Sequence, residues 1–152
     1  MPSGSNIPEK IWLLFQKYEN FNTKYFKENL LYLDHLNLSQ IHISVNGSTI
    51  YNITCDFPKK NVAELYQTTL NCLSIKNHLL TFKNFINGQT LLGFQLVNYD
   101  DSADIRSSLS GVLKINLKFR TTLADPAVAY ILGEALSVLS INYNRDIILN
   151  KI

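Results

Sequence analysis

The sequence predicts a mostly β domain, and two patterns support this fold class. Residues 111–119 show the most regular two-residue alternation in the chain, with Leu113, Ile115, Leu117 and Phe119 separated by polar residues. A strand that is buried on one face has this period, because successive side chains point to opposite sides. A second alternating run, Leu38–Val45, leads directly into Asn46-Gly47, the strongest short signal for a β-hairpin.

Length and composition set further limits. The chain has 152 residues, of which 46% are hydrophobic and 11% aromatic, enough for one domain with a real core. We expect a flexible lead-in over residues 1–7 and a single domain over residues 8–152. Charged residues make up 17%, below the roughly 25% usual for globular domains. So low a charge suits a protein that packs against copies of itself, and a net charge of +2 argues against specific nucleic-acid binding.

The two cysteines, Cys55 and Cys72, lack the CxxC spacing of a zinc site. We expect two small buried thiols rather than a disulfide. No signal-peptide pattern precedes Ile7, so we expect a reducing intracellular compartment, the cytoplasm or nucleus. No apolar run approaches the roughly 18 to 20 residues that a membrane span needs, and we expect no membrane span.

The first half of the chain predicts three strands. Ile11–Phe15 is a short apolar run of the length of a buried strand, and residues 16–37 predict a long structured loop that can include one helical turn. Leu38–Val45 predicts a strand with Ile41, Ile43 and Val45 on the buried face and Gln40, His42 and Ser44 on the wetter face. Ile50–Cys55 is expected to pair back with it across the Asn-Gly turn.

The period then changes to that of a helix. Apolar residues fall on one helical face at Val62, Leu65, Tyr66, Leu70 and Leu73. They predict one amphipathic helix over about residues 61–74, packed on a sheet, with Asn61 as the N-cap and Glu64 three residues later. The segment 80–86 predicts a short helix that ends at Asn87-Gly88.

The second half predicts further strands and contains one conflict. Thr90–Val97 predicts a strand in which Gly93 marks a bulge or a close backbone approach, and residues 98–110 predict a polar loop. Over Ala127–Ser140 the local rules are tied. Asp125-Pro126 is a good helix start, whereas Val128, Tyr130 and Ile131 favour a strand and Gly133 fits a helix poorly.

No residue pattern indicates catalysis. The histidines His35, His42 and His78 do not form a metal-binding set, and Asp100, Asp101 and Asp104 fit no calcium loop. Arg145 is expected to pair with Asp146, Glu134 or a neighbouring subunit. No nucleotide-binding or hydrolase motif occurs. We therefore predict that the protein is not an enzyme and has no catalytic, cofactor-binding or metal site.

A series of landmarks, in order along the chain, resembles a known family. They are Pro8-Glu9-Lys10-Ile11 before an apolar run, the hairpin Leu36–Gly47, the helix at Leu65–Leu73, Asn87-Gly88 before Leu91–Leu96, the strand Ser110–Phe119, and Leu123–Tyr143 followed by Asn144-Arg145. In this order and spacing, nearly all of residues 8–149 resemble the C-terminal jelly roll of the major capsid proteins of Polinton (Maverick) transposons and adintoviruses. These are double-jelly-roll proteins of the adenovirus and large DNA virus lineage.

There are two departures from the family. It usually has acidic residues in the last strand region, where this chain has Ser137, Ser140 and Asn142. The N-terminal jelly roll is absent, so the chain is either part of a longer two-jelly-roll protein or a jelly roll that exists alone.

The resemblance implies an all-β fold, an antiparallel jelly-roll β-sandwich with one inserted amphipathic helix at about residues 61–74, in which Ala127–Ser140 belongs to a long strand. It implies a structural protein of the virion capsid that forms a homotrimer, the pseudo-hexameric capsomer, and contacts other capsid proteins. The alternative is a stand-alone single jelly-roll module that binds carbohydrate or a protein partner, for example a domesticated capsid remnant. Its ligand groove would be lined by Trp12 or the aromatic residues of the segment 18–26. A cupin-type enzyme would need a bound metal.

Overall fold

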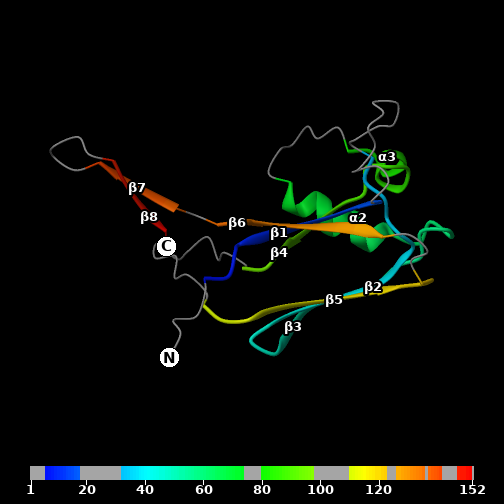
Figure 1. Ribbon diagram of the computed structural model, residues 1–152, viewed down its shortest axis with the longest axis horizontal. Coiled ribbons are helices and arrows are strands. Elements are labelled where there is room, and N and C mark those ends of the chain that lie inside the picture. The colour runs from blue at the N-terminus through cyan, green and yellow to red at the C-terminus, as the bar shows by residue number, and fades with distance from the viewer. Residues whose placement is uncertain are drawn as a thin grey trace.

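The structure, a computed structural model, describes residues 6–17, 32–73, 80–97, 110–122, 126–135, 137–141 and 147–151, the last two segments by their backbone (Figure 1). Two expected loops, over residues 16–37 and 98–110, lie mostly outside the described residues. Asp125, at the proposed helix start, also lies outside them.

Two antiparallel three-stranded sheets face each other and form a sandwich (Figure 1). One sheet has the order β4 (Leu91–Gln95), β1 (Lys10–Lys17), β6 (Ala127–Glu134), and the other has the order β3 (Ser48–Thr54), β2 (Leu38–Val45), β5 (Leu113–Phe119). A separate two-stranded sheet joins β7 (Ser137–Ile141) to β8 (Ile147–Lys151). The expectation of an all-β sandwich is confirmed.

Strand β1 lies at the centre of its sheet and supplies much of the core. Its inward side chains Ile11, Leu13 and Phe15 are at most 2% exposed. Each such side chain contributes about 1.5–3 kcal/mol to folding when it is removed from water. On the outer face Trp12 is half-buried beside helix α2 (Ala63–Cys72). The apolar run at Ile11–Phe15 is therefore a buried strand, as predicted.

The β2–β3 hairpin forms where the Asn-Gly pair predicts it. Asn46 and Gly47 have φ angles of 50° and 85°, the positive values that a type I′ turn requires. One residue is less exposed than predicted: Ser44, expected on the wetter face, is only 6% exposed. Ser44 still lies on the outer face, because the β2–β5 register is unbroken here and pairs it with the exposed Lys114.

The predicted amphipathic helix is α2, and it packs on β4. Its buried face is formed by Leu65, Thr69 and Cys72. Leu70 and Leu73, which were expected to point inward, are half-buried.

The predicted N-cap of α2 is also wrong. Val62 is at the cap position without a side-chain hydrogen bond. The backbone of Asn61 instead exchanges two hydrogen bonds with Asp56, at 2.9 and 3.0 Å. This bridge closes the turn before the helix, so Asn61 belongs to the turn rather than to the first helical turn.

The short second helix is confirmed as α3 (Phe82–Ile86). The Thr81 hydroxyl accepts a hydrogen bond from the Asn84 N–H at 3.2 Å, an N-cap contact that satisfies one of the free helical donors. The chain leaves the helix through Gly88, whose φ is 94°. Phe85 is fully buried and fixes the helix to the core.

The tie between helix and strand at residues 127–140 resolves in favour of strand. Ala127–Glu134 pairs along its whole length with β1, and Ser137–Ile141 is strand β7. The resemblance implied one long strand, whereas the structure has two, β6 and β7. The ladder between β1 and β6 ends at Lys10 opposite Glu134, and Pro8 cannot continue it because proline has no N–H.

Gly93 marks a close approach, one of the two alternatives that the sequence left open. A Cβ at this position would lie 2.5 Å from Cζ3 of Trp12 and 3.0 Å from Cβ of Cys72. The Gly93 N–H also donates to the Thr69 hydroxyl at 3.2 Å. Glycine at this position therefore lets β4 pack against both Trp12 and helix α2.

We predict that Gly93→Ala lowers the free energy of unfolding by about 1–3 kcal/mol, because the added methyl overpacks a filled site. Urea denaturation followed by circular dichroism measures this change. The matched control is Gly133→Ala in β6, whose added Cβ would meet only the Pro8 ring, at 3.1 Å or more. Equal stability losses for the two variants would contradict the conclusion that Gly93 is required for the close packing of β4 on Trp12 and helix α2.

Candidate interaction surface

The residues considered for chemistry have structural roles wherever they are described. His35 stacks on Phe57 with ring centroids 4.3 Å apart, and its Nδ1 accepts a hydrogen bond from the Asn37 N–H at 3.0 Å. Burial lowers the pKa of His35 and outweighs the opposing effect of the Asp34 carboxylate. A neutral, stacked imidazole supports the turn before β2.

His42 lies on the outer face of β2, as expected. Its ring nitrogens contact the Thr49 hydroxyl at 3.0 Å and the Asn116 side-chain amide at 3.1 Å. Next to it, the Gln40 amide donates to Asn52 at 2.9 Å. This polar network joins the three strands of the sheet across their solvent side, so it has the character of a cross-strand contact rather than a ligand set.

The two cysteines are free and buried. Burial raises the pKa of both Cys55 and Cys72 to about 11, so neither is a reactive thiolate. Within the described ranges, no three or more His, Cys, Asp or Glu side chains gather as metal ligands. His78, Asp100, Asp101, Asp104 and Arg145 lie outside those ranges.

The two long sides of the sandwich differ. On the side formed by β3 and β4, Tyr51 closes the space between the sheets. Its ring packs against Phe94 at a centroid distance of 5.3 Å, and its hydroxyl donates to the Gln95 carbonyl at 2.9 Å. This side of the core is covered.

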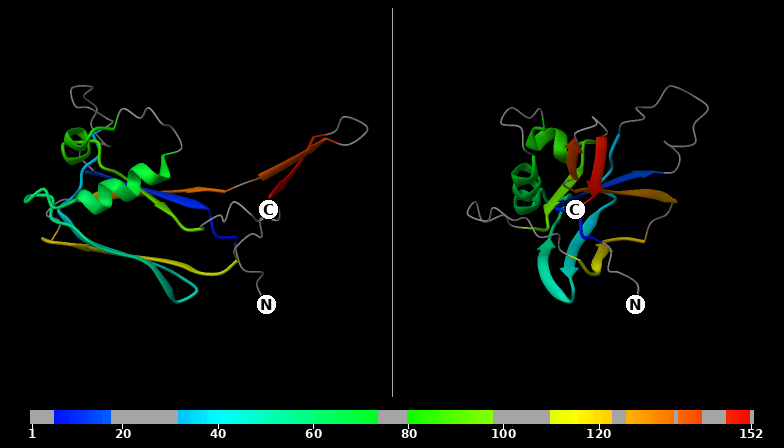
Figure 2. Two further views of the ribbon diagram at one scale, coloured as in Figure 1. Left: turned by 180° about the vertical axis from the view of Figure 1, so that it is seen from behind. Right: turned by 90° about the vertical axis from the view of Figure 1, so that its left-hand side faces the viewer.

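The opposite side is formed by β5 and β6, the edge strands of the two sheets, which lie on the same side of the sandwich in the right-hand view of Figure 2. The inward-facing residues of β5 are only half-buried: Leu113, Ile115, Leu117 and Phe119. Phe119 reaches Phe15 in an edge-to-face contact, with centroids 5.8 Å apart. We call this side, formed by the inward-facing residues of β5 and by residues 127–134 of β6, the open side.

Strand β6 is the more exposed part of the open side. Ile131 is the cross-strand partner of Leu13 and shares its inward face. Ile131 is nevertheless 59% exposed, whereas Leu13 is 1% exposed. On the other face of β6, Leu132 is 55% exposed. Two consecutive large apolar side chains, one on each face, are therefore in contact with water.

The backbone of β6 also has a free edge. The Glu134 carbonyl accepts a hydrogen bond from the Glu9 N–H at 2.8 Å, so Glu134 faces β1. In an antiparallel ladder the backbone groups alternate in direction. Ala129 and Ile131 therefore direct their N–H and C=O groups away from β1, where the described sheet has no further strand.

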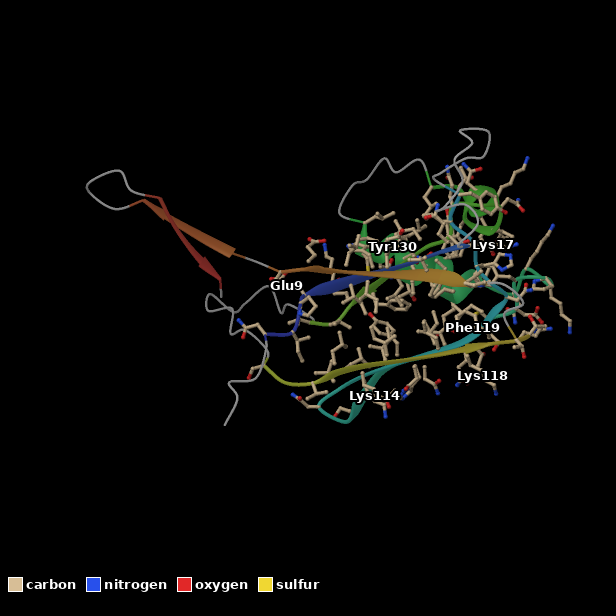
Figure 3. The ribbon with its side chains drawn as sticks, in the orientation of Figure 1. Glu9, Lys17, Lys114, Lys118, Phe119 and Tyr130 are labelled. Atoms are coloured by element: carbon tan, nitrogen blue, oxygen red, sulfur yellow. The ribbon has the colours of Figure 1, made fainter. Side chains whose placement is uncertain are left out.

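The edge of β5 carries charge instead. Figure 3 shows Lys114 and Lys118 pointing away from the sandwich, with Phe119 on the inner side. Arg120, directly after the strand, forms an ion pair with Asp56. Partial burial opposes ionisation of Asp56, but the hydrogen bond and charge of Arg120 hold the pKa of this carboxyl below its usual value.

The sequence contains one signal for the exposed strand. Residues 127–132 are apolar without alternation. A strand with this pattern is usually buried on both faces, which requires neighbours on both. In the described structure, the end of β6 at Ile131 and Leu132 has no such cover.

The chain matches no protein-family model, no curated protein and no solved structure. Neither of the helices in the described ranges is long and apolar enough to cross a membrane.

We predict that stability falls as the pH is lowered from about 7.5 to about 5, because of His35. The pKa of His35 is lower in the folded protein than in the unfolded chain, where it is about 6.5. As the pH falls, the unfolded chain therefore binds the proton first. The contribution of His35 to the free energy of unfolding is therefore fully present above that pH and decreases below it. Asp56, also lowered, acts in the same direction but at the more acidic pH of carboxylates.

Thermal unfolding at several pH values tests this prediction. His35→Phe keeps a ring on Phe57 and removes the titrating group, so its melting temperature should depend less on pH over this range. A variant whose pH dependence equals that of the unmodified protein would refute the assignment to His35.

Proposed function

We propose that this chain is a structural protein, a jelly-roll module of a capsid-type major shell protein that functions by self-association. The resemblance over residues 8–149 suggests the class. The observation that carries the proposal is the open side, where a folded sandwich leaves part of its core uncovered along two edge strands.

The strand pairing is compatible with a roll. Strand β1 pairs with β6, and β2 pairs with β5. In the sequence, both β2 and β5 lie between β1 and β6, so the β1–β6 pair encloses the β2–β5 pair. A complete jelly roll has eight strands. The described sandwich has six strands, and the described chain has two further strands in the separate β7–β8 sheet. The jelly-roll topology itself is part of the proposal.

Surface chemistry supports the same function. Only 17% of the residues are charged, and β6 exposes Ile131 and Leu132 together. Obligate interfaces are more apolar than ordinary surface and bury on the order of thousands of Å². By resemblance, the assembly would be a homotrimer of two-roll subunits in the capsid of a virion, together with other capsid proteins.

The alternative binding module would use an aromatic groove that includes Trp12. In the structure the Trp12 ring lies over Gly93 and beside Cys72 of α2, where it packs the helix against the sheet. The aromatic segment 18–26 lies outside the described residues. A ligand function for Trp12 therefore has no support from its surroundings, and we put forward only the structural function.

Electron microscopy and native mass spectrometry of the complete gene product test the proposal. We expect a discrete trimer with a six-sided outline, and a second jelly-roll sequence in the reading frame upstream of Met1. A monomer at high concentration, from a gene that encodes no second jelly roll, would contradict it. A free-standing module would give a complete gene at Met1 and a ligand-dependent rather than a shell-like assembly.

A further inference from the structure

We propose that the β7–β8 hairpin is an arm that adds to the free edge of β6 in a second copy of this chain. The inference deepens the proposed function, since it rests on self-association and assigns the contact that produces it. Three features carry it: the hairpin is a separate sheet, the outer edge of β6 has no neighbouring strand in the described sheet, and the sequence between β6 and β7 disfavours a tight turn.

The hairpin is a two-stranded sheet of its own that extends away from the sandwich in Figure 1. Its five register pairs run from Ser137 opposite Lys151 to Ile141 opposite Ile147. An isolated two-stranded hairpin is at best marginally stable in water. It therefore needs a further strand or an apolar surface to be well ordered.

The register divides the hairpin into two unlike faces. Paired positions share a face and alternate along a strand, so four apolar residues, Leu139, Ile141, Ile147 and Leu149, occupy positions on one face, with the polar pair Ser137 and Lys151 at the end of that face. The other face has Val138, Ser140, Ile148 and Asn150. One face is thus suited to burial and the other is mixed, the pattern of a ribbon that covers a core on one side.

Of the two edges on the open side, β6 is the one suited to receive a strand. Natural edge strands avoid pairing by carrying lysine, proline or inward charge. β5 has Lys114 and Lys118 along its length, whereas β6 has only Glu134, at its end. Among the described strands, none pairs with the outward backbone groups of Ala129 and Ile131, and Ile131 and Leu132 present apolar side chains to an added strand.

The same chain is poorly placed to supply this strand. Only Ala135 and Leu136 separate β6 from β7. A two-residue hairpin turn needs positive φ at one or both positions, which favours glycine, asparagine or aspartate. Alanine and leucine disfavour that turn, and Gly133 is already paired with Ile11 in the ladder. The hairpin forms a sheet of its own instead, and a second copy is the occupant of the β6 edge.

Exchange would also supply the missing strands. Six strands form the described sandwich, and a hairpin received from another copy would bring the number to eight. A reciprocal exchange gives a dimer, and a head-to-tail exchange around a three-fold axis gives a closed trimer. The mass of the complex distinguishes these two arrangements, and both contain the same contact between arm and edge.

The test uses the full chain and light scattering during gel filtration, from about 1 μM to about 1 mM, the range over which micromolar association is measured. Ile131→Lys places a charge on the receiving edge, and Leu149→Lys places one on the apolar face of the arm. The matched control is Ile50→Lys on β3, an exposed isoleucine of an edge strand on the opposite side of the other sheet. Circular dichroism checks that each variant is folded.

We expect the unmodified protein and Ile50→Lys to associate alike, and the other two variants to associate at least about tenfold more weakly. Mixing Ile131→Lys with Leu149→Lys should give a heterodimer that neither variant matches alone, because the intact arm of one can add to the intact edge of the other and form one unaltered contact. This heterodimer is specific to exchange between copies.

Two results would overturn the proposal. If the unmodified protein oligomerises and both variants associate equally well, the arm contact is wrong while the proposed function stands. If the unmodified protein is monomeric throughout the range, the arm contact and the self-assembling function both fail.

Discussion

The structure depends on one constraint: the inward faces of β1 and β2, the central strands of the two sheets, must be covered on both sides. Ile11 and Leu13 on β1 and Ile41 and Ile43 on β2 are at most 1% exposed, so the centre of the sandwich meets this requirement. Toward β3 and β4, Tyr51 completes the cover. Toward β5 and β6 the cover is incomplete, and this asymmetry accounts for the half-buried side chains of the open side. A core left partly uncovered along one side is a reason for a protein to associate.

The distribution of charge agrees with this asymmetry. Strand β5 carries Lys114 and Lys118, whose charges disfavour pairing with an approaching strand. Strand β6 has apolar residues on both faces, and its one charged residue, Glu134, is at its end. The described residues with shifted pKa values, namely His35, Tyr51, Cys55, Asp56 and Cys72, lie in packed or ion-paired settings.

Much of the local structure could be predicted from the sequence. The alternating runs predicted β2 and β5, and Asn46-Gly47 predicted the hairpin because its backbone conformation excludes most other residues. The errors were at positions where tertiary contacts outweigh local preference. Asn61 had the chemistry of an N-cap but pairs with Asp56, and Ser44 is buried although it lies on the outer face of β2 opposite Lys114. At Asp125-Pro126 the local helix signal was outweighed by the ladder that residues 127–134 form with β1, a contact more than 100 residues away in the chain.

The candidate surface was harder to predict than the fold. The apolar run in β6 was visible, but whether such a run is buried by its own chain or left for a partner depends on strand order. The division between β6 and β7 was also not visible, because it results from the point at which β1 ends. Jelly-roll identity and capsid function rest on the resemblance, since no compared protein matches.

Hydrogen exchange of individual amides at low and high protein concentration tests the central claim most directly. If copies exchange arms at the β6 edge, the amides of Ala129 and Ile131 and those of β7 and β8 should be protected as concentration rises, because they gain partners. Amides of β3, an edge strand on the covered side, should not change. Exchange rates for Ala129 and Ile131 that are independent of concentration, in a protein that still associates, would contradict the account.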